Sequence, residues 1–185
     1  MNSTAEQLEA PPAPAGDRPL RVLVVENGPG DGQPTARALL ARHDGGRYAL
    51  DWRARYADGL AAIRERRHDV YLIAGWIAGA SGVELVREAF SERRFAPVIM
   101  LGSDLDDEAA LALGVTDQIK AHELALPVLE RAIRHAVRHH GALTELARSE
   151  ERYSLAIRAA NDGIWDWDLI DGTFYVSPRW CAILG

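Results

Sequence analysis

The sequence predicts an α/β protein in which a five-stranded parallel sheet is covered by helices on both faces. Short apolar runs of strand length alternate with amphipathic segments of helix length throughout residues 20–125. The run at 70–73 carries no charge, which is typical of a central strand that is buried on both sides. Apolar residues make up 48% of the chain, enough for a core of this size.

The individual elements follow from this alternation and from the helix-capping signals. An apolar strand is expected at 20–25, followed by a glycine-rich loop at 28–32. Asp31 is expected to cap the next helix, with Pro34 in its first turn and the glycine pair at 45–46 ending it. The later expected elements are a strand at 48–54, a helix at 57–66, a strand at 69–74, a helix at 82–90, a strand at 97–101, a short helix at 106–113 and a weak strand at 117–120.

The carboxyl end of the third expected strand is the position where a functional residue is expected. In open α/β sheets, chemistry gathers where the strands end at their carboxyl termini. The residue at that end of the third strand is Ala74. Alanine offers no nucleophile, no charge and no metal-binding atom, so the usual position for chemistry is empty of reactive groups.

A long helix is expected at 126–160. Pro127 suits the first helical position, and apart from Gly141 no strong breaker follows before 161–163. Apolar residues recur at alternating spacings of four and three, a weak heptad seam made by Leu129, Ile133, Ala136 and Leu143, with His140 and Ala147 in the same series. We expect the helix to pack on the sheet first and then to continue as a linker that pairs two protomers. The alternative is one long surface helix on its own sheet.

The last stretch, 161–185, changes pattern again. Trp165, Trp167 and Leu169 alternate with aspartates as in a half-buried strand, and the following Asp171-Gly172 pair is a strong hairpin signal. A hairpin and part of a helix cannot bury that many aromatic residues alone. We therefore expect 161–185 to be the start of a second, truncated domain. The Ala/Pro-rich residues 1–19 are expected to be a disordered tail.

Composition excludes several classes of function. The formal net charge of −6 gives no reason to expect a nucleic acid or an anionic membrane as a partner. Cys181 is the single cysteine, so an internal disulfide is impossible and a reducing cytoplasm is the expected compartment. The amino terminus lacks the apolar segment of a signal peptide, and the run at 70–80 is too short to span a bilayer.

Residues 20 to 140 resemble the receiver domain of bacterial response regulators. The segment 24–31 is similar to the family's first strand with its acidic pair and loop, and 68–73 to its third strand. Gly82 lies where the family has a glycine eight residues past the phosphoacceptor, and 96–101 is similar to the fourth strand. This resemblance implies a sheet in flavodoxin-like order and a part in two-component signalling and phosphorelay.

Residues 149–185 resemble the opening of a PAS domain. The segments that carry the likeness are 149–153, 159–169 and 175–180. They cover about a third of such a domain, so cofactor pockets would lie beyond them. This PAS subtype often precedes diguanylate cyclase, phosphodiesterase or histidine kinase domains, and the resemblance implies such an output domain after residue 185.

The receiver resemblance also implies a set of site residues. In receivers, an aspartate ending the third strand attacks a phosphoryl group beside a divalent cation, and a hydroxyl and a lysine hold the phosphoryl oxygens. The corresponding residues here are Ala74 at the acceptor, Glu26 and Asn27 at the acidic pair, Gly102 at the hydroxyl, Ala121 at the lysine with Lys120 one residue early, and Gln118 at the aromatic switch.

These departures predict a non-catalytic pseudo-receiver that binds no metal or cofactor. Asp69 does not replace the lost acceptor, because it lies roughly 16 Å from Ala74, at the other end of the strand. An unusual acceptor among Ser103, Asp104 and Asp106 stays open. The expected partner is another protein, or a second copy bound through the last helix. The alternative is the regulatory front of a larger signalling enzyme.

Three weaker patterns have simpler explanations. The spaced glycines at 28–32 lack the lysine of a phosphate-binding loop, so a receiver-type loop is favoured. His135 and His139 have the spacing of metal ligands, but the arginines around them favour a solvated face. Trp165, Trp167 and Trp180 could form a ligand cage, but core and strand-face packing of a PAS domain is favoured.

Overall fold

The computed structural model describes residues 18–28, 35–42, 46–91, 96–103, 106–160, 165–167 and 169–184. It divides into two compact units, Met1–Val137 and Arg138–Gly185. In the described part of the chain, no helix is long and apolar enough to cross a membrane.

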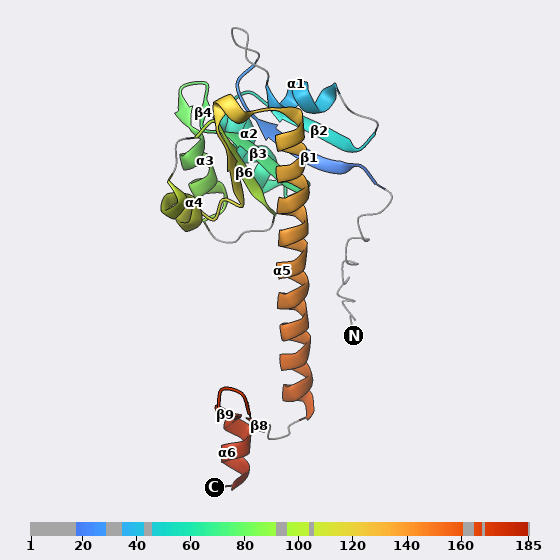
Figure 1. Cartoon of the computed structure of the whole chain (residues 1–185), viewed down its shortest axis with the longest axis vertical. Helices are drawn as coiled ribbons and strands as arrows, with labels where there is room; N and C mark the ends of the chain where they lie inside the picture. The colour runs from blue at the N-terminus through green and yellow to red at the C-terminus, as the bar shows by residue number, and fades with distance from the viewer. Residues whose placement is uncertain are drawn as a thin grey trace, which may run out of the picture. The chain divides into compact units, whose positions relative to one another are not determined.

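The first unit contains the expected five-stranded sheet, and all its strand pairs are parallel (Figure 1). Its order is β2-β1-β3-β6-β7, the order that the receiver resemblance implied. The strands are β1 (Leu20–Val25), β2 (Tyr48–Arg53), β3 (Val70–Ala74), β6 (Val98–Leu101) and β7 (Asp117–Ile119). The α/β prediction is therefore confirmed.

Helices cover both faces of this sheet, and each face has its own apolar core. The elements are α1 (Ala36–Ala41), α2 (Tyr56–Arg64), α3 (Gly82–Ala89), α4 (Asp107–Leu113), the short 3-10 helix η1 (Ala121–Glu123) and α5 (Leu126–Ala160). One core joins the sheet to α1 and α5, as Leu40 and Ile133 show. The other joins it to α2 and α3 through Ile63 and Leu85.

The first helix starts later than the sequence predicted. It begins at Ala36, and the Oγ1 atom of Thr35 accepts a hydrogen bond from the backbone N–H of Ala38 at 3.2 Å. Thr35 is therefore the N-cap of the described helix. Asp31 and Pro34, the expected cap and first-turn residue, lie outside the described residues. Asp31 and Thr35 are both residue types that cap helices, so the sequence alone did not decide between them.

A short hairpin after β3 was missed. Strands β4 (Trp76–Ile77) and β5 (Ala80–Ser81) pair antiparallel across a two-residue turn. Both turn residues have positive φ, 48° at Ala78 and 90° at Gly79. Such turns usually carry Asn-Gly or Asp-Gly, and Ala-Gly gives no comparable signal.

The burial of the first part of helix α5 corrects part of the expected dimer seam. Leu129, Ile133 and Ala136 are fully buried in the core of the first unit. They pack against the protein's own sheet, so they do not face a second protomer in this fold. Leu143, the fourth residue of the expected seam, is exposed, with 53% of its surface accessible. The expectation that the helix packs first on the sheet is met, and pairing through its later part stays a prediction.

The second unit contains the end of α5 and a small antiparallel hairpin. Strand β8 (Trp165–Trp167) pairs with β9 (Phe174–Val176), and α6 (Pro178–Leu184) follows. Trp165 and Trp167 are 54% and 58% exposed, and Phe174 is 60% exposed. These aromatic side chains on the hairpin thus remain largely uncovered.

Candidate functional site

The parallel register brings the expected site residues to one edge of the sheet. Ala74 at the end of β3 lies opposite Leu101 at the end of β6, and Leu101 lies opposite Ile119 of β7. The next residues continue the ladder, because Gly75 N–H donates to the Leu101 carbonyl at 2.7 Å. Glu26 and Asn27 follow β1 at the same edge. The carboxyl edge of the sheet is therefore the candidate site.

Glu26 is buried and caps helix α1. Only 6% of its surface is accessible. Its Oε2 atom accepts from the Ala36 N–H at 3.0 Å, and its Oε1 atom accepts from the Arg37 N–H at 2.9 Å. Burial raises the pKa of this carboxyl group, while the bonds from the helix backbone and from Thr35 oppose that rise. Both oxygens are thus committed to the first N–H groups of a helix.

Asn27 fastens the end of β1 to the hairpin after β3. Its Nδ2 group donates to the Trp76 carbonyl at 3.3 Å. Its Oδ1 atom accepts from the Ala78 N–H at 2.6 Å. The side chain that the receiver resemblance assigns to the acidic pair therefore holds a loop in place.

The end of β3 is closely packed around Ala74. A Cβ atom added at Gly82 would lie 1.8 Å from the Ala74 carbonyl oxygen. A Cβ atom at Gly75 would lie 3.0 Å from the Gly102 carbonyl and 3.1 Å from the Ser103 Cα. Glycine is required at position 82 because the loop after β3 passes directly over the strand end.

The 3-10 helix η1, which follows β7, places Ala121 beside the expected hydroxyl position. A Cβ atom added at Gly102 would lie 3.7 Å from the Ala121 Cβ, whereas Lys120 is exposed. Gln118, at the expected switch position, is half-buried in β7. Its Oε1 atom and the Oγ atom of Ser103 are buried and, within the described residues, have no hydrogen-bond partner.

A divalent cation does not fit the residues at this edge. Mg²⁺ takes oxygen ligands, chiefly carboxylates and waters. Glu26 is occupied by α1, Asn27 is occupied by the hairpin, and Ala74 has no donor atom. Elsewhere in the described ranges, no cluster of three or more His, Cys, Asp or Glu residues is placed to hold a metal ion.

The other residues considered as phosphoacceptors or metal ligands lie in different environments. Asp106 is exposed, and its Oδ1 atom accepts from the Ala109 N–H at 2.7 Å. The Ser103 hydroxyl is buried, and Asp104 lies outside the described residues, as does the loop at 29–34. Asp69 lies before β3, where its carboxylate contacts the Arg18 and Arg21 side chains. The exposed His135 and His139 belong to no metal-binding cluster in the described part of the chain.

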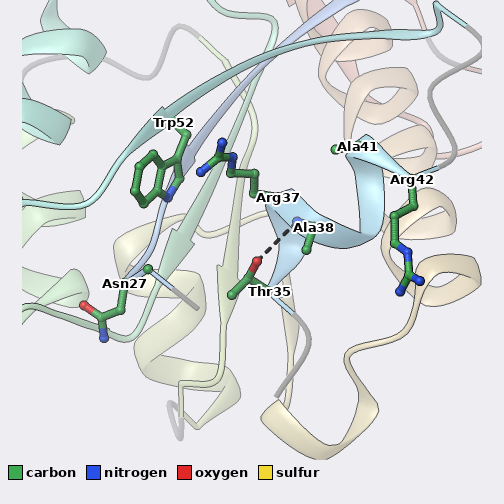
Figure 2. Close-up of a pocket in the computed structure, with 8 residues that line it drawn as sticks. Asn27, Thr35, Arg37, Ala38, Ala41, Arg42 and Trp52 are labelled. Carbon is green, nitrogen blue, oxygen red and sulfur yellow. Dashed lines mark hydrogen bonds between the residues drawn. The ribbon is translucent and has the colours of Figure 1, made fainter. Parts of the chain in front are cut away.

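A pocket beside this edge was missed by sequence reasoning. It measures about 460 Å³ and lies between α1, the end of β1 and β2 (Figure 2). Its lining is mostly apolar and consists of Asn27, Gly28, Thr35, Arg37, Ala38, Ala41, Arg42 and Trp52. The Arg37 guanidinium lies over the Trp52 ring, 4.5 Å from the ring centre. Part of the signal was present, because Arg37, Ala38, Ala41 and Arg42 share one face of a helix.

Solved structures with the same architecture belong to response-regulator receivers. A CheY-like receiver domain protein from Methanospirillum hungatei JF-1 has a TM-score of 0.53 at 20% identity, covering 67% of this chain and 98% of that one. This chain has the receiver fold. The signal receiver domain of a LuxO repressor protein from Vibrio parahaemolyticus has a TM-score of 0.55 at 18% identity, covering 70% and 97%. NtrX from Brucella abortus has a TM-score of 0.56 at 20% identity, covering 70% of this chain and 29% of NtrX.

Sequence comparisons add one short match to this receiver fold. No protein-family model matches the chain. Hybrid signal transduction histidine kinase A from Dictyostelium discoideum is 44% identical over 39 residues, which is 21% of this chain. The match spans 2% of that kinase. The whole kinase's activity therefore says little directly about this chain.

Proposed function

We propose that this chain is a non-catalytic regulatory module of a signal-transduction protein, a pseudo-receiver that is not phosphorylated at the family's acceptor position. The observation that carries the proposal is Ala74 at the end of β3. Phosphotransfer to a receiver needs an attacking carboxylate oxygen, which alanine lacks. A signalling role is supported by the receiver fold and by the short likeness to a hybrid histidine kinase.

The neighbouring residues support the same proposal. Glu26 caps α1 through both carboxylate oxygens, so a cation would have to displace two helix N–H bonds. Lys120 is exposed, and Ala121 rather than a lysine lies beside Gly102. A phosphoryl group at this edge would therefore find neither its metal nor its cationic partner.

Intact-mass spectrometry after incubation with acetyl phosphate and Mg²⁺ tests the proposal. The mass should stay unchanged, while a conventional receiver treated in parallel gains a phosphoryl group of about 80 Da. An adduct mapped to Ser103, Asp104 or Asp106 would mean that an unusual acceptor is used.

Restoring the acceptor should not restore phosphorylation. The variant Ala74→Asp regains the nucleophile but keeps the occupied Glu26, the amide at Asn27 and the exposed Lys120. We expect no adduct with acetyl phosphate. A phosphorylated Ala74→Asp protein would show that the other departures matter little.

We also propose that α5 couples the receiver fold to the start of a PAS domain and pairs two protomers beyond residue 137. Leu143, Leu146 and Tyr153 support pairing, since they are 53%, 57% and 63% exposed at heptad-like spacing. Sedimentation of two truncations tests it. Removal of 162–185 should leave a weak dimer, and removal of 141–185 a monomer. A stable dimer of the shorter form would move the interface onto the sheet domain.

The second candidate is that the chain is the regulatory front of a larger signalling enzyme. The likeness to a hybrid histidine kinase favours it, as does the PAS-like start at 149–185. The output would be a histidine kinase, a diguanylate cyclase or a phosphodiesterase. Reading the coding sequence past Gly185 decides between these outputs. A cytoplasmic location remains a prediction, which a fluorescent-protein fusion checks.

A further inference from the structure

The hairpin after β3 presents an exposed tryptophan on a fixed support. Trp76 is 62% exposed, although its neighbour Ile77 is fully buried in the core. The turn holds Ala78 at a φ of 48°, a conformation that costs a non-glycine residue energy. Asn27 holds this turn through the bond to the Ala78 N–H. The indole of Trp76 is therefore exposed on a backbone that is already ordered.

The mostly apolar pocket lies next to this hairpin. Asn27 belongs to both, because it lines the pocket and bonds the Trp76 carbonyl. Trp52 is held in place at the pocket by its Nε1–H, which donates to the Glu26 carbonyl at 3.2 Å. Figure 2 shows Arg37 between Trp52 and the helix, and Arg42 at the far end of α1. A concave apolar site of about 460 Å³ is large enough for a bulky side chain.

Two guanidinium groups give this surface a local positive charge. No ion pair joins Arg37 or Arg42 to a carboxylate of the described residues, and both are exposed. The chain as a whole carries a formal charge of −6, so the charge of these two arginines is opposite in sign to the net charge of the protein. Charge complementarity of this kind steers and selects partners.

We propose that Trp76, Asn27 and the pocket lined by Trp52 and Arg37, here called the Trp52–Trp76 face, form a docking site for an acidic segment of a partner protein. The segment carries one large apolar side chain, which enters the pocket, and flanking carboxylates that meet Arg37 and Arg42. Tryptophan and arginine are the residues that most often dominate binding energy at interfaces. Ordered supports lower the entropy cost of docking. The proposal does not depend on whether the chain is phosphorylated.

The five tryptophans of the chain provide the test. Their indole N–H signals in a ¹⁵N-¹H correlation spectrum separate the Trp52–Trp76 face from Trp165, Trp167 and Trp180 of the second unit. The probe is a short synthetic peptide with one leucine flanked by glutamates, added to the full chain. The signals of Trp52 and Trp76 should shift saturably, and those of the other three should not.

Two matched peptides separate the charge from the apolar anchor. A peptide with glutamines in place of the glutamates should bind roughly three- to tenfold more weakly, the range expected for two exposed charge pairs. A peptide with alanine in place of leucine should lose binding as well. Equal binding of the glutamine peptide would overturn the inference that the partner is acidic.

Protein variants locate the site. Trp76→Ala and Arg37→Gln should each weaken binding of the glutamate peptide. Arg87→Gln should not, because Arg87 lies on α3 and pairs with Glu84. Shifts confined to Trp165, Trp167 and Trp180, or no shifts, would overturn the proposal. Shifts of Trp52 and Trp76 with protein concentration alone would make a second copy the occupant and would overturn it too.

Discussion

The two ends of the parallel sheet each hold a buried or half-buried carboxylate, and the two carboxylates have different partners. Before β3, Asp69 accepts from the Arg18 guanidinium at 2.9 Å, from the Arg21 N–H at 2.9 Å and from the Arg21 guanidinium at 3.2 Å. After β1, the partners of Glu26 within the described residues are the backbone N–H groups of Ala36 and Arg37 and the side chain of Thr35. The comparison teaches that the two carboxylates are engaged by different partners, arginine groups at one end of the sheet and a helix terminus at the other.

Their pKa values also move in opposite directions. Burial by itself would raise the pKa of Asp69, but the bonds from Arg21 and Arg18 together outweigh it, and the pKa falls below the ordinary 3.8. For Glu26, burial outweighs the helix bonds and raises the pKa above 4.5. The charges of Arg21 and Arg18 thus favour ionised Asp69, whereas burial disfavours ionised Glu26 in spite of its bonds to the helix terminus.

The largest expected effect is at the carboxyl end, in Gly82→Ala. The new Cβ would lie 1.8 Å from the Ala74 carbonyl, so the hairpin or the strand must move. We expect the free energy of unfolding to fall by roughly 3 kcal/mol or more, measured by urea denaturation. Gly28→Ala is the matched control, because nothing lies within 4 Å of its added Cβ. Equal losses in both variants would contradict the close packing over Ala74.

The second effect concerns the helix cap. Glu26→Gln replaces one acceptor by an NH₂ group that faces a helix N–H, so a buried donor is left unsatisfied. The free energy of unfolding should fall by about 1–3 kcal/mol. Glu88→Gln is the control, since the bonds that its carboxylate accepts from Tyr56 and Arg64 are exposed. Mg²⁺ should leave the wild-type melting temperature unchanged, and a rise that Glu26→Gln removes would identify Glu26 as a metal ligand.

The third effect concerns Asp69, at the amino end of β3. Asp69→Asn removes the charge that Arg18 and Arg21 bind, and should cost about 1–2 kcal/mol at pH 7. Because the folded pKa of Asp69 is lowered, its contribution is present above pH 3.8 and is lost as the pH falls through the folded value. Urea denaturation at neutral and acidic pH should therefore show the variant losing less stability than the wild type.

The smallest effect concerns His68, beside the same end of the sheet. Burial lowers its pKa, although its Nε2 atom lies 3.2 Å from the Asp51 Oδ2 atom, which acts in the opposite direction. As the pH falls through 6.5, the unfolded chain takes up the proton first, so stability falls. His68→Gln should flatten this part of the profile, measured as the urea midpoint against pH. An unchanged slope would mean that another group titrates there.

Much of the fold was predictable from local patterns. Short apolar runs, their lengths and the breakers between them predicted five parallel strands, because a strand buried on both faces leaves a continuous apolar run. The position of Ala74 followed as well, since it ends one such run and precedes Gly82 by eight residues. These features depend on neighbours in the chain, so the sequence by itself determined them.

The tertiary structure decided which partner each polar or apolar side chain meets. Glu26 has a carboxylate that could bind a metal ion. In the fold, however, both of its oxygens accept hydrogen bonds from the start of α1, ten residues later. Leu129, Ile133 and Ala136 have the spacing of a dimer seam, yet the sheet buries them. The same apolar stripe can be buried equally well against a second helix or against a sheet, because hydrophobic burial is non-directional. Only the packed three-dimensional arrangement shows which surface covers it.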